Sequence, residues 1–203
     1  MKPRPSGLAL VLVLSAIAPL SAHATEQILH LDPAGTQVAF ELPATGHDVH
    51  GVFVLRSGDI HFDAATGTAS GELLVDAASA KTGNGSRDKT MHGEVLESSK
   101  FPLFRFTAER LEGTLAATGE SHVTLHGKLA IHGADHPMAL PATVSVNGDQ
   151  IQVKTRFSVP FVAWGMEDPS FLMFRVEKEV AVTVQAKGRL EGVTVDAASG
   201  ASR

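Results

Sequence analysis

The stretch TGNGSRDKTMHGEVLESSKFPLFRF, residues 82–106, differs in character from the sequence on either side of it. It is polar and punctuated by glycine, whereas the flanking segments alternate apolar and polar residues as β-strands do. Within it, Ser86 is the expected N-cap of a helix, and Asp88 suits the positive end of the helix dipole. Pro102 ends the helix because the residue before a proline favours extended geometry. The sequence therefore predicts a short helix over residues 87–96, set between strands.

Period-2 alternation extends outward from this stretch and dominates from residue 36 to residue 187. Asn147-Gly148 lies between two alternating runs and predicts a tight hairpin, because both turn positions are expected to accept a positive φ. The predicted strands cover residues 38–42, 49–55, 60–62, 69–75, 104–109, 123–131, 142–146, 151–159 and 180–186. Roughly eight or nine antiparallel strands of this kind form a sandwich or a closed barrel, and closure is attractive because it removes exposed edges. The alternation alone does not choose between the two.

The first residues are typical of a targeting signal. A short basic region precedes the apolar run 8–20, which is too short to span a bilayer, and Ala22-His23-Ala24 has the spacing that signal peptidase cleaves. We expect a signal peptide over residues 1–24 and a single domain over residues 25–190. Residues 191–203 are small and polar, so they are expected to form a disordered tail.

The composition excludes several classes of partner. The sequence has no cysteine, so neither a lipoprotein-type lipid anchor nor a disulfide is expected. Its net charge is −5, and loss of the basic signal would make the remaining chain more acidic. Scattered acidic residues argue against nucleic acid and against electrostatic docking on anionic lipid. We expect an exported, soluble periplasmic protein that does not span a membrane, and the sequence does not distinguish a monomer from a homodimer.

Several motifs in and around residues 82–106 carry a family resemblance. They are Ser86-Arg87-Asp88-Lys89, Leu96-Glu97-Ser98, Phe101-Pro102-Leu103-Phe104-Arg105-Phe106, His50-Gly51-Val52-Phe53, Gly58-Asp59-Ile60-His61-Phe62-Asp63 and Leu125-His126-Gly127-Lys128-Leu129. In their order and spacing along the chain, the motifs resemble the YceI-like family of periplasmic lipid- and polyisoprenoid-binding proteins, over about residues 29–190. The resemblance implies a lipocalin-like antiparallel β-barrel with a helix-bearing connection. It also implies an elongated apolar interior that holds a long isoprenoid or fatty-acyl chain.

The apolar strand faces supply the candidate ligand-binding residues. These are Phe40, Phe53, Phe62, Leu73, Met91, Phe104, Phe106, Leu125, Phe157, Trp164, Phe171 and Phe174. The aromatic segment 161–174 contains the single tryptophan, which is either part of a hydrophobic flap over a barrel mouth or a buried anchor. An alternative function is an interaction module whose barrel is filled by its own side chains.

Three polar residues of the predicted helix are candidates for a head-group contact. Arg87 has the fork geometry that clamps an anionic group, while Asp88 and His92 lie one helical turn apart. The same residues could instead hold the helix to the barrel, or form the site of a hydrolase acting on a lipid or small ester. No nucleophile with a base at a suggestive spacing accompanies them, so binding is favoured over catalysis and no cofactor is expected.

The histidines invite a metal interpretation. His122, His126 and His132 share one strand parity, opposite the apolar residues of the same run, so they are expected on the solvent face. Zinc needs three or four converging ligands, and residues spaced along an outer face diverge. No metal site is therefore expected, and the predicted turn from His132 to His136 is the best remaining candidate.

Overall fold

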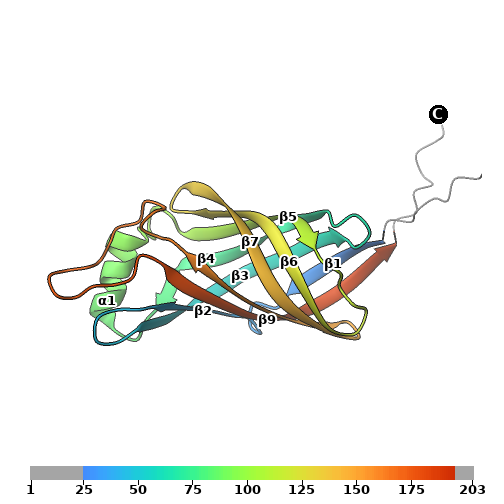
Figure 1. The fold of residues 1–203 in the computed structure, drawn as a ribbon, viewed down its shortest axis with the longest axis horizontal. Coiled ribbons are helices and arrows are strands. Elements are labelled where there is room, and N and C mark those ends of the chain that lie inside the picture. The colour runs from blue at the N-terminus through green and yellow to red at the C-terminus, as the bar shows by residue number, and fades with distance from the viewer. Residues whose placement is uncertain (1–24, 195–203) are drawn as a thin grey trace, which may run out of the picture.

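Nine strands and two consecutive helical segments, with the links between them, make up residues 25–194, the part of the chain that the computed structural model describes (Figure 1). The elements are β1 (Thr25–Leu31), β2 (Gln37–Leu42), β3 (Val49–Asp63), β4 (Ala69–Lys81), α1 (Gly85–Thr90), the π-helical turn η1 (Met91–Val95), β5 (Leu103–Glu112), β6 (Gly119–Ile131), β7 (Ala134–Asn147), β8 (Gln150–Val159) and β9 (Val180–Thr194). All strand pairs are antiparallel, and the sheet closes on itself. The prediction of an all-β, lipocalin-like barrel with one short helix in a long connection is confirmed.

The barrel closes because β1 and β2 share one position between β3 and β9. Both strands run antiparallel to β3 and β9, β1 near residues 59–63 and 188–194, and β2 near residues 49–53 and 181–185. The backbone N–H of Asp32, in the link between them, donates to the carbonyl of Lys187 at 2.8 Å. The pairing of β3 with β4 completes the circle. Eight positions thus form a barrel without a free edge, as the closure argument anticipates.

The strands are longer than the alternation predicts. β3 is continuous through Asp63, where two strands were expected, because a register shift between Leu55 and Ser57 lets the ladder with β4 continue through residues 56–59. β1 is absent from the predicted set. β9 continues to Thr194 and pairs with β1, so the expected domain end at residue 190 falls inside a strand. The predicted signal peptide and residues 195–203 of the predicted tail lie outside the described residues.

Two hairpins show how turn chemistry sets the register. Asn147 pairs with Gln150, so the two-residue loop is Gly148-Asp149, and only Gly148 has a positive φ, of 64°. The predicted hairpin is confirmed, but its turn lies one residue later and has the pattern of a type II′ turn, with glycine first. Between β6 and β7, His132 and Gly133 both have positive φ, of 51° and 81°, as a type I′ turn requires.

The helix starts earlier and ends differently from the prediction. Its N-cap is Asn84 instead of Ser86, since the Asn84 side chain accepts hydrogen bonds from the backbone N–H groups of Ser86 and Arg87, both at 3.1 Å. The last turn is π-helical, with Leu96 N–H donating to the carbonyl of Met91. Both helical segments are short, and no helix within residues 25–194 has the length and hydropathy to cross a membrane.

The two ends of the barrel are packed differently. At the end where β1 begins and β9 finishes, Val123, Val144, Val146 and Ile151 form a tightly buried cluster that fills the interior. The helix covers the opposite end (Figure 1). Apolar side chains there surround an open space instead of meeting at the centre, and this space is the candidate site.

Candidate functional site

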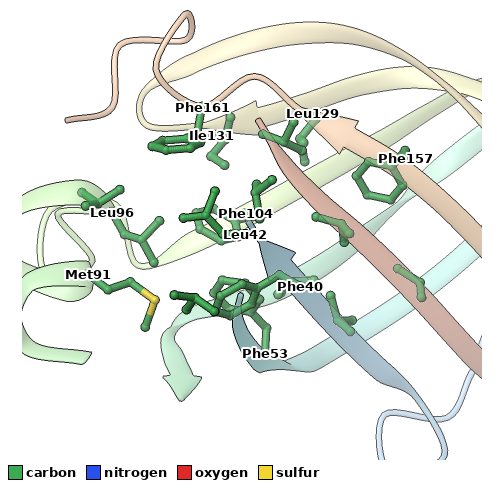
Figure 2. Close-up of a pocket in the computed structure, with 18 of the residues that line it drawn as sticks. Phe40, Leu42, Phe53, Met91, Leu96, Phe104, Leu129, Ile131, Phe157 and Phe161 are labelled. Atoms are coloured by element: carbon green, nitrogen blue, oxygen red, sulfur yellow. The ribbon is translucent and has the colours of Figure 1, made fainter. Parts of the chain in front are cut away.

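A cavity of about 820 Å³ occupies the barrel between the helix and the filled end (Figure 2). This volume lies within the roughly 300–1,000 Å³ typical of small-molecule sites. Every strand and the helix contribute to its wall, and the wall is overwhelmingly apolar. A filled barrel, the alternative left open by the sequence, is therefore not what this chain forms at its helical end.

Strand alternation aims the wall side chains into the cavity and makes the cavity long. On β8 every second residue from Val153 to Val159 lines it, and on β9 every second residue from Val180 to Ala186 does so. Each of these runs covers six residue-to-residue steps, or about 20 Å of strand, so the cavity is a deep tunnel along the barrel. Its volume and depth together fit a narrow, extended ligand.

Three phenylalanines form one wall of the tunnel. The ring centroids of Phe40 and Phe53 lie 5.1 Å apart, and those of Phe53 and Phe104 lie 5.5 Å apart in an edge-to-face arrangement (Figure 2). The Phe40 ring lies over its β3 partner, Gly51, where an added Cβ would come within 2.3 Å of a ring atom. Glycine at this position leaves the space that the ring occupies beside the neighbouring strand.

The structure places most of the predicted wall residues on the cavity surface. They are Phe40, Phe53, Leu73, Met91, Phe104, Phe106, Leu125, Phe157, Phe171 and Phe174. Leu129, Ile131 and Val182 also line the cavity although they were not among the candidates. Their strand parity is the signal that could have identified them, and the candidate set was weighted toward aromatic residues instead.

Two predicted wall residues lie elsewhere. Phe62 is buried among Ile60, Ala69 and other side chains beside the cavity, where the barrel interior is already filled. Trp164 stacks face to face on His136, with centroids 3.9 Å apart and planes inclined by 6°. It packs against the apolar cluster at the helical end and does not line the cavity. Trp164 is thus a half-buried packing residue of its segment, in which Phe161 and Met166 are the buried residues, and the cavity is lined instead by Phe171 and Phe174.

Arg87 and Asp88 hold the helix to the end of β4 through one residue, Thr82. Arg87 Nε donates to the Thr82 hydroxyl at 2.8 Å, and its Nη2 donates to the Thr82 carbonyl at 2.9 Å. Asp88 Oδ1 accepts from the Thr82 hydroxyl at 2.5 Å and from its backbone N–H at 2.9 Å. The hydrogen bond from the Thr82 hydroxyl holds the pKa of the Asp88 carboxyl below its usual value. Of the two charged side chains, only Arg87 lines the cavity.

His92 is paired with Ser98, which was not among the predicted site residues. Its Nε2 donates to the Ala80 carbonyl at 2.9 Å, and its Nδ1 lies 3.1 Å from the hydroxyl of Ser98, which is buried. A serine beside a histidine has the composition of a nucleophile and its base. Neither side chain lines the cavity, so the pair lacks contact with the space where a substrate would lie. It joins the π-helical turn to β4.

The histidines follow the parity prediction only in part. His122 is exposed, and His126 pairs with Glu112 at 2.8 Å on the outer face. The prediction for His132 is wrong: it occupies the β6–β7 turn, where strand parity no longer applies. Its ring packs on Phe101 at 4.6 Å between centroids, and its Nε2 lies 2.8 Å from Glu97. Across residues 25–194, no group of three or more His, Asp or Glu side chains is arranged to hold a metal ion.

Comparison with known proteins assigns this chain to a family. A family model described as the YceI-like domain matches residues 29–188. The chain belongs to the YceI-like family. It is 28% identical over 138 residues to a UPF0312 protein of Shewanella putrefaciens, an alignment that covers 66% of this chain and 70% of that protein.

Solved structures of similar fold include Burkholderia cenocepacia BcnA, with a TM-score of 0.61, 20% identity, and coverage of 77% of this chain and 98% of BcnA. Another is a polyisoprenoid binding domain from Saccharophagus degradans implicated in plant cell wall breakdown. It has a TM-score of 0.63, 17% identity, and coverage of 79% of this chain and 97% of that domain. At these identities the likeness concerns the fold alone.

Proposed function

We propose that this YceI-like protein binds a long-chain apolar ligand, a polyisoprenoid or an acyl lipid, inside its barrel without covalent attachment. The observation that carries the proposal is the apolar tunnel of about 820 Å³. A folded chain normally fills its interior to crystal-like density, so an apolar space of this size that persists in the fold is suited to a guest.

The wall chemistry favours a hydrocarbon chain over a compact polar molecule. Thr155 is the polar residue among the strand residues that line the tunnel, and Thr36 contributes a second hydroxyl from the β1–β2 link; the other strand residues of the wall are apolar. Burying on the order of 300 Å² of ligand hydrocarbon at about 25 cal/mol per Å² yields roughly 7 kcal/mol before entropic costs. That is enough for micromolar-class capture. The polyisoprenoid-binding name of the Saccharophagus degradans domain supports the same ligand class.

The polar part of the wall is concentrated at the helical mouth, which sets the direction of the ligand. Arg87 and its neighbours on the helix line this mouth, together with His47 from the β2–β3 link. We place the hydrocarbon toward the filled end and the polar head at the mouth, with Arg87 as the head-group contact. Asp88 and His92 then support the helix and do not touch the ligand.

The N-terminal signal pattern supports a place in the periplasm, where an apolar chain needs shielding from water. Transport, storage and sensing of the ligand are each compatible with such a carrier. Catalysis requires a reacting group in contact with the substrate, and the Ser98–His92 pair lies away from the tunnel. We therefore propose a binding protein that needs no cofactor.

Native mass spectrometry of the purified protein, followed by solvent extraction and lipid analysis, tests this proposal. The expected result is a retained hydrocarbon-chain lipid. Phe106→Asp places an unpaired charge in the tunnel wall and should abolish retention, with some loss of stability. The matched control is Thr107→Asp, one residue along β5 and paired with Lys128 on β6. A wild-type protein that folds, carries no lipid and takes up none when offered would refute the proposal, as would full retention in a folded Phe106→Asp variant.

A further inference from the structure

We propose that the hairpin tip of the β8–β9 loop, Phe171-Leu172-Met173-Phe174, inserts into the surface of a lipid bilayer and brings the cavity mouth against the membrane. These four residues, here called the apolar tip, are consecutive, large and exposed, with exposed fractions of 72%, 76%, 87% and 61%. The loop that carries them spans residues 160–179 and reaches past α1 at the open end of the barrel (Figure 1). The inference rests on the proposed function only for what the docked protein would exchange with the bilayer.

The backbone conformation of the apolar tip gives no structural reason for an apolar residue at Leu172. Phe171 and Phe174 exchange both of their backbone hydrogen bonds at 2.9 Å, which closes a tight turn. Leu172 occupies the first turn position with a φ of 51°, a conformation that favours glycine or asparagine and is costly for leucine. Neither turn chemistry nor core packing selects leucine at this position, since its side chain is exposed. Leucine is thus disfavoured here both by the positive φ and by its exposure to water, so its presence points to contact with an apolar surface.

The base of the loop holds the apolar tip in a defined position. Asp168 and Lys178 form an ion pair across the loop. Thr45, in the β2–β3 link, donates its backbone N–H to the carbonyl of Arg175 at 2.8 Å and accepts the Arg175 N–H through its hydroxyl at 3.2 Å. Val176 donates to the Ser170 hydroxyl at 3.2 Å. The apolar tip therefore projects from a loop base that is fixed by an ion pair and hydrogen bonds. Insertion into a bilayer then costs little conformational entropy of the loop.

The position of the apolar tip matches a bilayer better than a protein partner. Its exposed fractions correspond to roughly 500 Å² of apolar surface, less than the ~800 Å² that each partner buries in a stable protein interface. Phe171 and Phe174 also line the cavity, whereas Leu172 and Met173 do not. The tip is thus continuous with the tunnel wall, and it gives a hydrocarbon chain leaving the bilayer an apolar side of the mouth to follow, beside the polar residues of the helix.

The charges near the apolar tip indicate what kind of bilayer it contacts. Arg175 follows the tip directly, but Glu167, Glu177 and Glu179 lie on the same loop, and Lys178 is paired with Asp168. No basic cluster is present on this loop to attract anionic lipid. Insertion is therefore driven by the hydrophobic effect, and it should occur on zwitterionic phosphatidylcholine vesicles and persist at high salt.

Flotation of the purified full chain with phosphatidylcholine vesicles tests the inference. The tip variant is Leu172→Asn with Met173→Ser, in which asparagine suits the positive φ. The matched control removes two other exposed apolar side chains, Val52→Ser with Val54→Ser, on the outer wall of β3. The wild type and the control should float with vesicles at low and high salt, and the partition coefficient of the tip variant should fall at least tenfold.

Equal flotation of the tip variant and the wild type, or no flotation of either, would overturn the inference. A wild type that is dimeric in solution and a tip variant that is monomeric would also overturn it, because the tip would then be a self-association surface. Lipid retention, measured on the same variants by native mass spectrometry, separates this inference from the proposed function. The tip variant should keep its bound lipid while losing vesicle binding, and a protein without bound lipid that still floats would leave the docking inference standing alone.

Discussion

Placing the same bulky side chain in the hollow and in the filled half of the barrel should have opposite consequences. Val182, on β9, faces the tunnel between Phe40 and Phe157, whereas Val144, on β7, is 5% exposed within the cluster that fills the far end. Replacing valine by phenylalanine adds a ring of the same size in both places. Overpacking a filled core costs typically 1–3 kcal/mol, so Val144→Phe should lower the thermal midpoint by roughly 2–10 °C.

In Val182→Phe the new ring enters the tunnel and needs no rearrangement of its neighbours. The midpoint of the ligand-free protein should be unchanged or slightly higher, because the ring buries apolar surface that now lines empty space. The ring also takes the place of two or three methylenes of the ligand. At about 0.8 kcal/mol for each, affinity should fall by about 2 kcal/mol, or roughly 30-fold.

Thermal unfolding by circular dichroism and titration with a fluorescent fatty-acyl probe measure both effects. Val144→Phe, once folded, should bind the probe as the wild type does. A Val182→Phe protein that is as destabilised as Val144→Phe and binds the probe normally would refute the reasoning. Val182 would then face a packed interior, and the ligand would lie elsewhere.

Two further predictions concern the wall and the loop. Gly51→Ala should lower the free energy of unfolding, measured with denaturant, by about 1–3 kcal/mol, because the new Cβ would lie 2.3 Å from the Phe40 ring. Adding Phe40→Leu should relieve part of that loss. Strict additivity of the two changes in the double variant would contradict this explanation. The hydrogen bond from Lys178 lowers the pKa of Asp168 to about 2 from 3.8, so the stability that Asp168 contributes is complete above about pH 4 and is lost as the pH falls through about 2. Asp168→Asn should therefore flatten the dependence of the unfolding free energy on pH between about 2 and 4, and an unchanged slope would show that the pair does not stabilise the fold.

The local sequence pattern was sufficient to predict which side chains point into the barrel wherever those side chains lie on a regular strand. The alternation of Val38 to Leu42 and of Ile151 to Val159 placed Phe40 and Phe157 on the inner face, because successive strand residues point to opposite sides. Turn chemistry located the β7–β8 hairpin to within one residue, but Gly148 alone takes the positive φ. The N-cap was misassigned because Asn84 and Ser86 both carry suitable oxygens, and only the contacts of the folded chain distinguish them.

The residues that line the cavity were harder to predict, because the hollow and the filled parts of the barrel interior show the same alternation of apolar and polar residues. Phe62 and Phe106 have the same inward parity, yet only Phe106 reaches the cavity, since the filling of the barrel interior varies along its length. Trp164 lies in an irregular segment with no parity to follow, and its partner, His136, is distant in the sequence. Pairs such as His92 with Ser98 depend on where a π-helical turn folds back, which no spacing rule encodes.

By itself, the sequence determined that this protein is an antiparallel β-structure with a capped helical insert and apolar inner faces, because period-2 alternation, glycine turns and helix signals act over a few residues. It did not determine whether those inner faces meet or stand apart. That was decided by the closure of the strands into a ring, with β1 and β2 in one position, and by the cluster around Val144 that fills only one end. A cavity is a property of distances between strands, and such distances exist only once the barrel has closed.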